Sequence, residues 1–333
     1  MNLLDTTLRD GGNVVGHGFS KELTVSMIEG LMKAGIYEIE YGNCKGLGAY
    51  EQENATKALT DEEYLAIAEP YCKTAHLGMF VGAKRAKAEK IQAAADAGLN
   101  FIRVGNEAGN GKNSIAAVKM VKDAGLVCRY ALMKSYLLAP VELAKEAKML
   151  EEAGVDKITI MDSAGTMFPD ETTEYVKALK ETVLIPVGFH GHSNLGLSQA
   201  NALAAVKAGA DEVDCGLLGM ARSAGNCTTE LAVATLKRKG LLDEVDLYSL
   251  LHYLEDELIP AMEEYHYHVA VDPVSLLMGF YGCHSSFLPL LRAAAESKKV
   301  SIYQLIERVS AQDRKAPGKE LIDAVAEEIR KKI

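Results

Sequence analysis

The fold is decided by a short unit that is clearest at Ala153-Gly154-Val155-Asp156-Lys157-Ile158-Thr159, where Ala-Gly separates a helix-like segment from a β-rich run. The unit recurs at Ala34-Gly35, Ala97-Gly98, Ala124-Gly125 and Ala208-Gly209. Each glycine is placed to end a helix, because the residue just after a helix often adopts the left-handed conformation that glycine favours. We therefore predict that helix and strand alternate along the chain.

Working outward from these units, the spacing leaves room for three further strands. We expect eight strands, which lie near Asn2, Ile36, Thr74, Leu99, Leu126, Val155, Leu184 and Asp211. Strands that alternate with helices form right-handed βαβ units and a parallel sheet. Eight such units over about 240 residues match a closed (β/α)8 TIM barrel better than an open doubly wound sheet.

The β-rich theme stops at Lys239, and the remainder of the chain shows the spacing of helices. Apolar residues recur at helical intervals from Leu250, Leu288 and Leu321. We therefore expect a TIM-barrel catalytic domain at 1–239 and a helical C-terminal domain at 240–333 that docks on the barrel.

Composition and charge narrow the function. The chain has 333 residues, 48% of them hydrophobic, and a formal net charge of −10. Nucleic acid and anionic membranes both favour a basic surface, so neither is expected as a partner. The six cysteines lie far apart without a C-x-x-C motif, which is typical of reduced thiols. Without a signal-like start or a long apolar run, we expect a cytoplasmic location.

Polar residues follow the predicted strands, where a TIM barrel carries its active site. The first strand leads into Asp5-Thr-Thr-Leu-Arg9-Asp10-Gly11-Gly12-Asn13, and the seventh ends at His190-Gly-His192-Ser-Asn194-Leu-Gly196. Other strands end at Glu40, Asn106, Glu107, Lys134, Asp162 and Ser163. These side chains are expected to share one rim.

Asp10, His190 and His192 are the candidate metal ligands. Strand alternation would send two histidines at H-x-H to opposite faces, so both reach one ion only if the chain turns there, which Gly191 permits. A site with one carboxylate and two imidazoles admits Mn²⁺, Mg²⁺, Co²⁺ or Zn²⁺, although the absence of thiolate makes zinc less compelling. Asn226 is either a further oxygen ligand or a turn residue.

Each of these residues also has a plainer interpretation. Asp10 could be an ordinary turn or capping residue, and the histidine pair could be hydrogen-bonded at a crowded rim. A second pair, His266 and His268, lies in the helical region without an acid beside it, and we interpret it as structural.

At these positions the chain resembles the DRE-TIM metallolyase superfamily of HMG-CoA lyase-like barrels. The superfamily includes 3-hydroxy-3-methylglutaryl-CoA lyase, isopropylmalate synthase and 4-hydroxy-2-oxovalerate aldolase, and the aldolases are the most similar branch. The likeness rests on Asp5 to Gly11, His17, Ile39-Glu40-x-Gly42 with Gly46-Leu-Gly48, Met161 to Gly165, Gly188 to Leu197, Ala224-Gly225-Asn226 and Ser285-Ser286-Phe287-Leu288. It spans nearly the whole chain.

The resemblance implies a divalent metal, with Mn²⁺ the first choice, held by Asp10, His190 and His192. It places Arg9 at the substrate's oxyanion and Ser163 in contact with the substrate, and Asn13 and His190 are also expected to contact it. The implied reaction cleaves a 4-hydroxy-2-oxo acid to pyruvate and an aldehyde, or runs in reverse. The aldolase relatives pair with an acylating aldehyde dehydrogenase, so such a partner is implied as well.

Two departures from the aldolases concern the catalytic base. Asn13 stands where they carry a catalytic histidine, and His284 stands where they carry a tyrosine. An amide cannot act as a base near neutral pH, whereas an imidazole can. We therefore hypothesise that His284 transfers the proton, with His17 as the competing candidate.

Two other functions compete with the aldolase. The synthase and lyase branches carry an amide at or near the Asn13 position, which favours an acyl-CoA-dependent Claisen enzyme of the same superfamily. The third interpretation is a non-catalytic barrel, for which the substitutions at Asn13 and His284 are the support.

Overall fold

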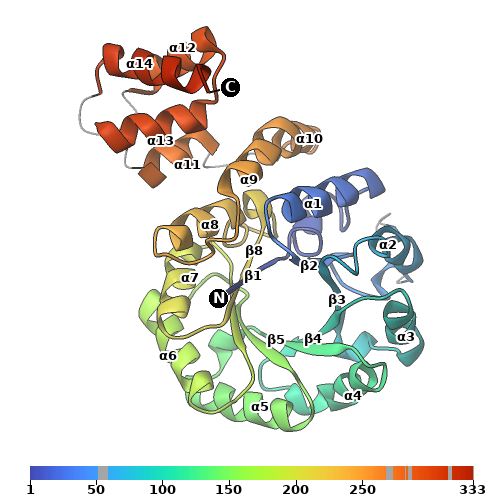
Figure 1. Cartoon of the computed structure of the whole chain (residues 1–333). Coiled ribbons are helices and arrows are strands. Elements are labelled where there is room, and N and C mark those ends of the chain that lie inside the picture. Colours follow the sequence, from blue (N-terminus) through green and yellow to red (C-terminus); the bar gives the residue numbers. More distant parts are fainter. Residues whose placement is uncertain (52–58, 268–272, 282, 284–286, 314–316, 333) are drawn as a thin grey trace.

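Eight parallel strands close into a barrel in chain order, with β8 pairing back onto β1, so the predicted TIM barrel is confirmed (Figure 1). The computed structural model describes residues 1–51, 59–267, 273–281, 283, 287–313 and 317–332. The strands are β1 (Asn2–Asp5), β2 (Glu38–Tyr41), β3 (His76–Gly82), β4 (Phe101–Glu107), β5 (Val127–Met133), β6 (Lys157–Asp162), β7 (Val187–Gly191) and β8 (Glu212–Cys215).

The Ala-Gly units end helices, as their sequence predicts. All five glycines have a φ between 78° and 105°, and the alanine before each of them is the C-cap of its helix. This left-handed residue closes the helix and turns the chain into the next strand.

Eight helices surround the strands and cover their outer faces (Figure 1). They are α1 (Lys21–Lys33), α2 (Asp61–Ala68), α3 (Ala88–Asp96), α4 (Ile115–Asp123), α5 (Pro140–Glu152), α6 (Pro169–Lys180), α7 (Ser198–Lys207) and α8 (Thr229–Lys237). Their starts follow known capping rules: Thr60 and Glu63 form a reciprocal capping box on α2, and α5 and α6 begin at proline.

Short 3-10 turns connect six of the strands to the helices that follow. They are η1 (Gly11–Val14), η2 (Ala49–Glu51), η3 (Ala83–Arg85), η4 (Gly111–Ser114), η5 (Ser135–Leu137) and η6 (Leu217–Gly219). Because they follow the carboxyl ends of the strands, they form the rim where the candidate site lies.

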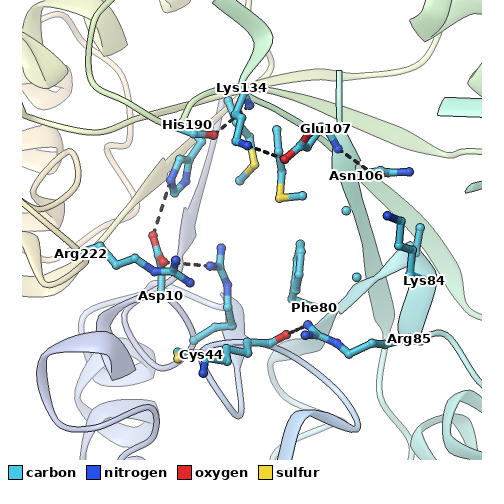
Figure 2. Close-up of a pocket in the computed structure, with 18 of the residues that line it drawn as sticks. Asp10, Cys44, Phe80, Lys84, Arg85, Asn106, Glu107, Lys134, His190 and Arg222 are labelled. Carbon is cyan, nitrogen blue, oxygen red and sulfur yellow. Dashed lines mark hydrogen bonds and ion pairs between the residues drawn. The ribbon is translucent and has the colours of Figure 1, made fainter. Parts of the chain in front are cut away.

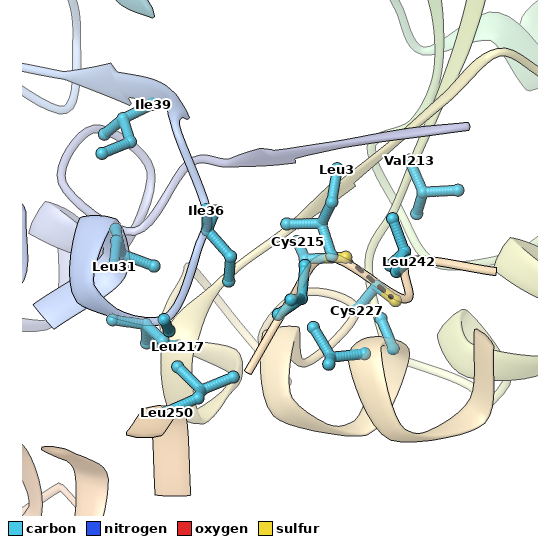
Figure 3. Packing of buried hydrophobic residues seen from close by; sticks show 14 of the residues in the cluster. Leu3, Leu31, Ile36, Ile39, Val213, Cys215, Leu217, Cys227, Leu242 and Leu250 are labelled. Carbon is cyan, nitrogen blue, oxygen red and sulfur yellow. Dashed lines mark hydrogen bonds between the residues drawn. The ribbon is translucent and has the colours of Figure 1, made fainter. Parts of the chain in front are cut away.

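The seam between β1 and β8 is sealed by apolar packing. Figure 3 shows Leu3, Val213 and Leu242 around the thiols of Cys215 and Cys227, whose sulfur atoms lie 3.7 Å apart. All six cysteines are free and buried.

The C-terminal region is helical where it is described, as predicted. It comprises α9 (Leu247–Tyr253), the π-helical turn η7 (Leu254–Leu258), α10 (Ile259–Glu263), α11 (Pro273–Tyr281), α12 (Leu288–Lys298), α13 (Ile302–Gln312) and α14 (Lys319–Arg330). Helix α9 contacts α1 and α8, while α11 to α14 form a cluster beside the barrel (Figure 1). The domain boundary at 239 and 240 stays a prediction. Within the described part of the chain, no helix has the length and apolar character that a membrane span requires.

Candidate functional site

A cavity of about 700 Å³ opens at the carboxyl ends of the barrel strands (Figure 2). Among the residues that line it are Arg9, Asp10, Ser163, His190 and His192. Residues predicted from strand ends far apart in the sequence are therefore brought to one place, on the face where TIM barrels carry their active sites.

Asp10, His190 and His192 converge at one side of this cavity. Oδ2 of Asp10 lies 3.7 Å from Nε2 of His190 and 3.8 Å from Nε2 of His192, and the two imidazole nitrogens are 3.4 Å apart. All three potential ligand atoms lie within 4.8 Å of one another. This arrangement can hold one divalent ion and leaves coordination positions open, as catalytic sites do.

Two tight turns place these side chains. After β1 the backbone N–H groups of Arg9 and Asp10 both donate to the carbonyl of Thr6, and the chain then enters the Gly11-Gly12 turn. A Cβ on Gly11 would lie 3.1 Å from the Cβ of Met220, so the packing favours glycine there.

After β7 the strand ends at Gly191, and His192 pairs instead with Asn226 in an antiparallel bridge. Gly191 itself does not take a positive φ. It is needed for space, since a Cβ would lie 2.9 Å from the Phe189 ring. The change of pairing partner is what brings both histidines to one side.

Asp10 and His190 also belong to a closed ring of charged groups, which we call the charge ring. Its members are Asp10, Arg9, Glu40, Arg103, Asp214 and His190. Arg9 pairs with Oδ1 of Asp10 at 3.0 Å and with Glu40 at 2.5 Å. Arg103 pairs with Glu40 at 2.9 Å and with Asp214 at 2.5 Å. Nδ1 of His190 lies 3.2 Å from Asp214, and His190 faces Asp10 across the candidate metal position.

The ring holds His190 in the orientation that metal binding would require. With Nδ1–H donating to Asp214, the lone pair of Nε2 points toward Asp10 and His192, which is how ligating histidines are usually held. Burial raises the pKa of Asp214, but attraction to Arg103 and the hydrogen bond with His190 hold that pKa well below its usual range. Asp214 is therefore a carboxylate, as this role requires.

The protonation states of the other two candidate ligands also suit a metal ion. Burial raises the pKa of Asp10, but the charges of Arg9, His190 and His192 outweigh it and bring the pKa to about 2. Burial and then repulsion from His190 lower the pKa of His192 to about 4. A carboxylate and a neutral imidazole are the forms that coordinate metals.

Asn226 offers a further buried oxygen beside the cluster. Its Nδ2 donates to Oδ2 of Asp10 at 3.0 Å, while its Oδ1 is buried without a hydrogen-bond partner. An unsatisfied buried amide oxygen costs free energy, and a nearby cation would satisfy it.

Arg9 has one donor left for a ligand. Its guanidinium lies over the Phe80 ring, 5.1 Å from the centroid, and its Nη2 is buried without a hydrogen-bond partner. Ser163 also lines the cavity: its Oγ accepts from the backbone N–H of Lys134 at 2.9 Å. The hydroxyl hydrogen of Ser163 can still be donated to a ligand.

Asn13 does not line the main cavity. Its Nδ2 donates to the carbonyl of Asp10 at 2.8 Å, and its Oδ1 accepts from Nε of Arg222 at 3.0 Å. It borders a neighbouring hollow of about 590 Å³ that shares Arg222 and Ser223 with the main cavity. Its contact with substrate therefore stays a prediction. In the structure, Asn13 connects Asp10 to Arg222.

Of the two candidate bases, one is described. His17 is half-buried and is not among the residues that line the main cavity. Burial lowers the pKa of His17, as do the charges of Lys45 and Arg222. His284 lies outside the described residues, so its role stays a prediction. The competing metal pair is not brought to the site: His266 is exposed, and His268 is also outside the described residues.

Two members of the charge ring, Arg103 and Asp214, were not predicted from the sequence as site residues. Both are fully buried, although they stand in the middle of predicted strands. The signal was present, because a charged residue inside an otherwise apolar strand needs a buried partner.

Comparisons with known proteins assign the family. The model of the HMGL-like family matches residues 1–256. The chain belongs to the HMGL-like family. It is 34% identical over 331 residues to 4-hydroxy-2-oxovalerate aldolase from Carboxydothermus hydrogenoformans, covering 99% of this chain and 98% of that protein. These findings confirm the predicted resemblance and make the chain a carbon–carbon lyase.

Solved structures share the fold of this HMGL-like chain. The N-terminal domain of a putative aldolase from Bacteroides vulgatus matches with a TM-score of 0.68 and 23% identity, over 85% of this chain and 93% of that one. HMG-CoA lyase from Bacillus subtilis matches with a TM-score of 0.67 and 19% identity, over 81% and 95%.

Proposed function

We propose that this protein is a divalent-metal-dependent aldolase that cleaves a 4-hydroxy-2-oxo acid to pyruvate and an aldehyde, or catalyses the reverse addition. One observation carries the proposal: Asp10, His190 and His192 offer ligand atoms within 4.8 Å of one another, beside an Arg9 donor without a partner. The named activity of the relative that matches nearly the whole chain supports the same reaction.

The donor set and its surroundings fit a divalent ion. The buried carboxylate, the two imidazoles and the unpartnered oxygen of Asn226 are ligands that Mn²⁺, Mg²⁺, Co²⁺ and Zn²⁺ accept. We propose Mn²⁺ as the native ion, because the set mixes oxygen and nitrogen and contains no thiolate. When bound, the ion would supply Lewis acidity toward the 2-oxo acid.

The residues of the chain then have distinct tasks. The free Nη2 of Arg9 would donate to the oxygen that becomes negative as the C3–C4 bond breaks, and it is held for this by Asp10 and Glu40. Such a preorganised donor is worth about 3 kcal/mol in the transition state. Ser163 would orient the substrate through its free hydroxyl hydrogen, and a base, His284 or His17, would take the proton of the 4-hydroxyl group.

Two features of the protein's surroundings belong to the same proposal. The aldehyde product is reactive, so an acylating aldehyde dehydrogenase is the proposed partner, by analogy with the relatives. The six free, buried thiols support a reducing cytoplasm as the location.

The test begins with metal removal. Protein dialysed against a chelator should lose pyruvate release from 4-hydroxy-2-oxo acids of several lengths and regain it on addition of Mn²⁺. The Asp10→Asn variant should lose about 10²-fold or more in kcat, because it removes a candidate metal ligand and the negative charge that pairs with Arg9. The control is Asp123→Asn, an exposed carboxylate paired with Lys119 on α4. Full pyruvate release by metal-free protein would contradict the proposal.

The same protein preparation can be assayed for the competing activity, that of an acyl-CoA-dependent Claisen enzyme. Release of free thiol from acetyl-CoA in the presence of 2-oxo acids, without pyruvate release, would assign the chain to Claisen chemistry instead.

A further inference from the structure

The cavity extends well beyond the candidate metal position, and its far side is basic. The lining includes Lys45, Lys84, Arg85 and Arg222, in addition to Arg9 and Lys134. Figure 2 shows Lys84 and Arg85 across the cavity from Asp10 and His190. A chain with 46 acidic and 36 basic side chains therefore gathers cations around one opening.

The cations around the cavity differ in whether a carboxylate forms an ion pair with them. Arg9 is paired with Asp10 and Glu40, and Lys134 is paired with Glu107. By contrast, within the described ranges no carboxylate forms an ion pair with Lys45, Lys84, Arg85 or Arg222. Four unpaired positive charges around one cavity repel one another unless an anion enters.

Arg85 is held in place for such an anion. Its Nη2 donates to the backbone carbonyl of Lys45, which joins η3 to the loop after β2 (Figure 2). Its Nε is buried without a hydrogen-bond partner, so this N–H remains available to a ligand. Arg85 is thus a partly buried guanidinium with a fixed position and no acid beside it, although burial lowers its pKa. A planar guanidinium of this kind suits carboxylate and phosphate groups.

We propose that the substrate carries a second anionic group, a carboxylate or a phosphate, at the end remote from its 2-oxo acid, and that Arg85 and Lys84 bind it. This inference rests on the proposed function, because the metal side and Arg9 receive the 2-oxo acid end. The remaining anion must then belong to the aldehyde half, beyond C4. The cavity volume of about 700 Å³ leaves room for such an extended substrate, since ligand cavities range upward from about 300 Å³.

The experiment runs the reaction in the direction of addition, with pyruvate and matched pairs of aldehydes. One pair is 4-oxobutanoate and butanal, and the other is glyceraldehyde 3-phosphate and glyceraldehyde. One of the charged aldehydes should have a kcat/KM at least about tenfold above that of its neutral partner, the expected effect of one charge-assisted hydrogen bond. The pair that shows the preference identifies carboxylate or phosphate.

Substitutions then test the assignment. Arg85→Gln should bring the charged-to-neutral ratio close to one, and Arg85→Lys should retain a preference. Lys84→Gln should lower the ratio as well, and its exposed side chain makes it usable if Arg85→Gln does not fold. Lys33→Gln, an exposed lysine at the end of α1, is the control and should leave the ratio unchanged.

A separate measurement keeps this inference apart from the proposed function. Metal-loaded protein should exchange the methyl protons of pyruvate for deuterium without any aldehyde, which NMR detects. Exchange together with equal rates for charged and neutral aldehydes would overturn the second anion site alone. Absence of both exchange and pyruvate release would overturn the proposed function, and the second site with it.

Discussion

A single residue, Asp214, illustrates how the site is supported from behind. It does not line the cavity, yet it accepts from Nδ1 of His190 at 3.2 Å and pairs with Arg103. We expect Asp214→Asn to weaken Mn²⁺ binding by about 10–100-fold, the usual cost of losing such a partner. Isothermal titration calorimetry of the metal-free protein measures this directly.

The control for this prediction is again the exposed Asp123→Asn. An unchanged dissociation constant in a folded Asp214→Asn protein would mean that the charge ring does not hold His190 for the metal. A change in thermal stability without a change in metal affinity would show that the role of Asp214 is structural.

Substitution distinguishes the two candidate bases, His284 and His17. His284→Ala should lower kcat by about 10²–10⁴-fold, the usual range for a general base. It should also remove the limb of the pH–rate profile that reports an imidazole. His17→Ala should keep that limb. Full turnover by His284→Ala, with loss in His17→Ala, would reverse the assignment.

At the residue scale, the sequence predicted those positions that follow strands. Asp10, His190 and His192 could be found because strand ends meet on one rim of a barrel. Arg103 and Asp214 could not be paired in advance, because they are 111 positions apart and lie inside strands. Their contact exists only once the barrel closes and turns both side chains inward.

At the scale of elements, the seam where β1 meets β8 carries two buried acids whose pKa values are raised. Asp5 on β1 accepts from the hydroxyl of Thr229 on α8 at 2.7 Å, and Glu230 accepts from the backbone N–H of Leu218 at 3.2 Å. Burial raises the pKa of Asp5 to about 6 and that of Glu230 to about 8. Below these pKa values each carboxyl group keeps, in the folded state, a proton that the unfolded chain releases near pH 4.

The raised pKa of Glu230 predicts how the free energy of unfolding depends on pH. Between about pH 4.3 and 8 the unfolded chain has lost the Glu230 proton while the folded chain retains it. The free energy of unfolding therefore falls as pH rises, by up to about 1.4 kcal/mol per pH unit for this group. Glu230→Gln should remove that part of the slope and be more stable than the unaltered protein at pH 8, with a smaller difference at pH 5.

Urea unfolding at pH 5 and pH 8 measures how the free energy of unfolding changes with pH in the unaltered protein and in Glu230→Gln. Glu174→Gln, an exposed position on α6, is the control and should leave the pH dependence unchanged. Equal slopes for Glu230→Gln and the unaltered protein would show that Glu230 is ionised in the folded state.

The order of elements was predictable because it depends on local chemistry. Glycine after a helix requires little beyond its own conformational freedom, so the Ala-Gly units place helix ends and the strands that follow them. The 3-10 turns such as η3 and η6 were not foreseen, since their shape depends on neighbours across the rim. In the C-terminal region, Leu250, Leu288 and Leu321 predicted helices that the structure contains as α9, α12 and α14.

At the scale of the whole molecule, closure of the barrel creates charge patterns that no segment has by itself. In the sequence, Lys84 and Arg85 are an ordinary pair of basic residues. They become part of a basic cavity only because Lys45 and Arg222 reach the same cavity from other loops. The acidic surface and the basic cavity of one chain thus follow from topology rather than from composition.

The charge ring also has a consequence for the sequence of events in catalysis. It contains three carboxylates and two guanidiniums, so with His190 as the neutral imidazole that metal binding requires, the ring itself carries one net negative charge. Arrival of a dication reverses the sign to one net positive charge. The charge ring would repel the carboxylate of a 2-oxo acid before this reversal and attract it afterwards. We therefore expect compulsory-order binding, in which the ion enters first and leaves last.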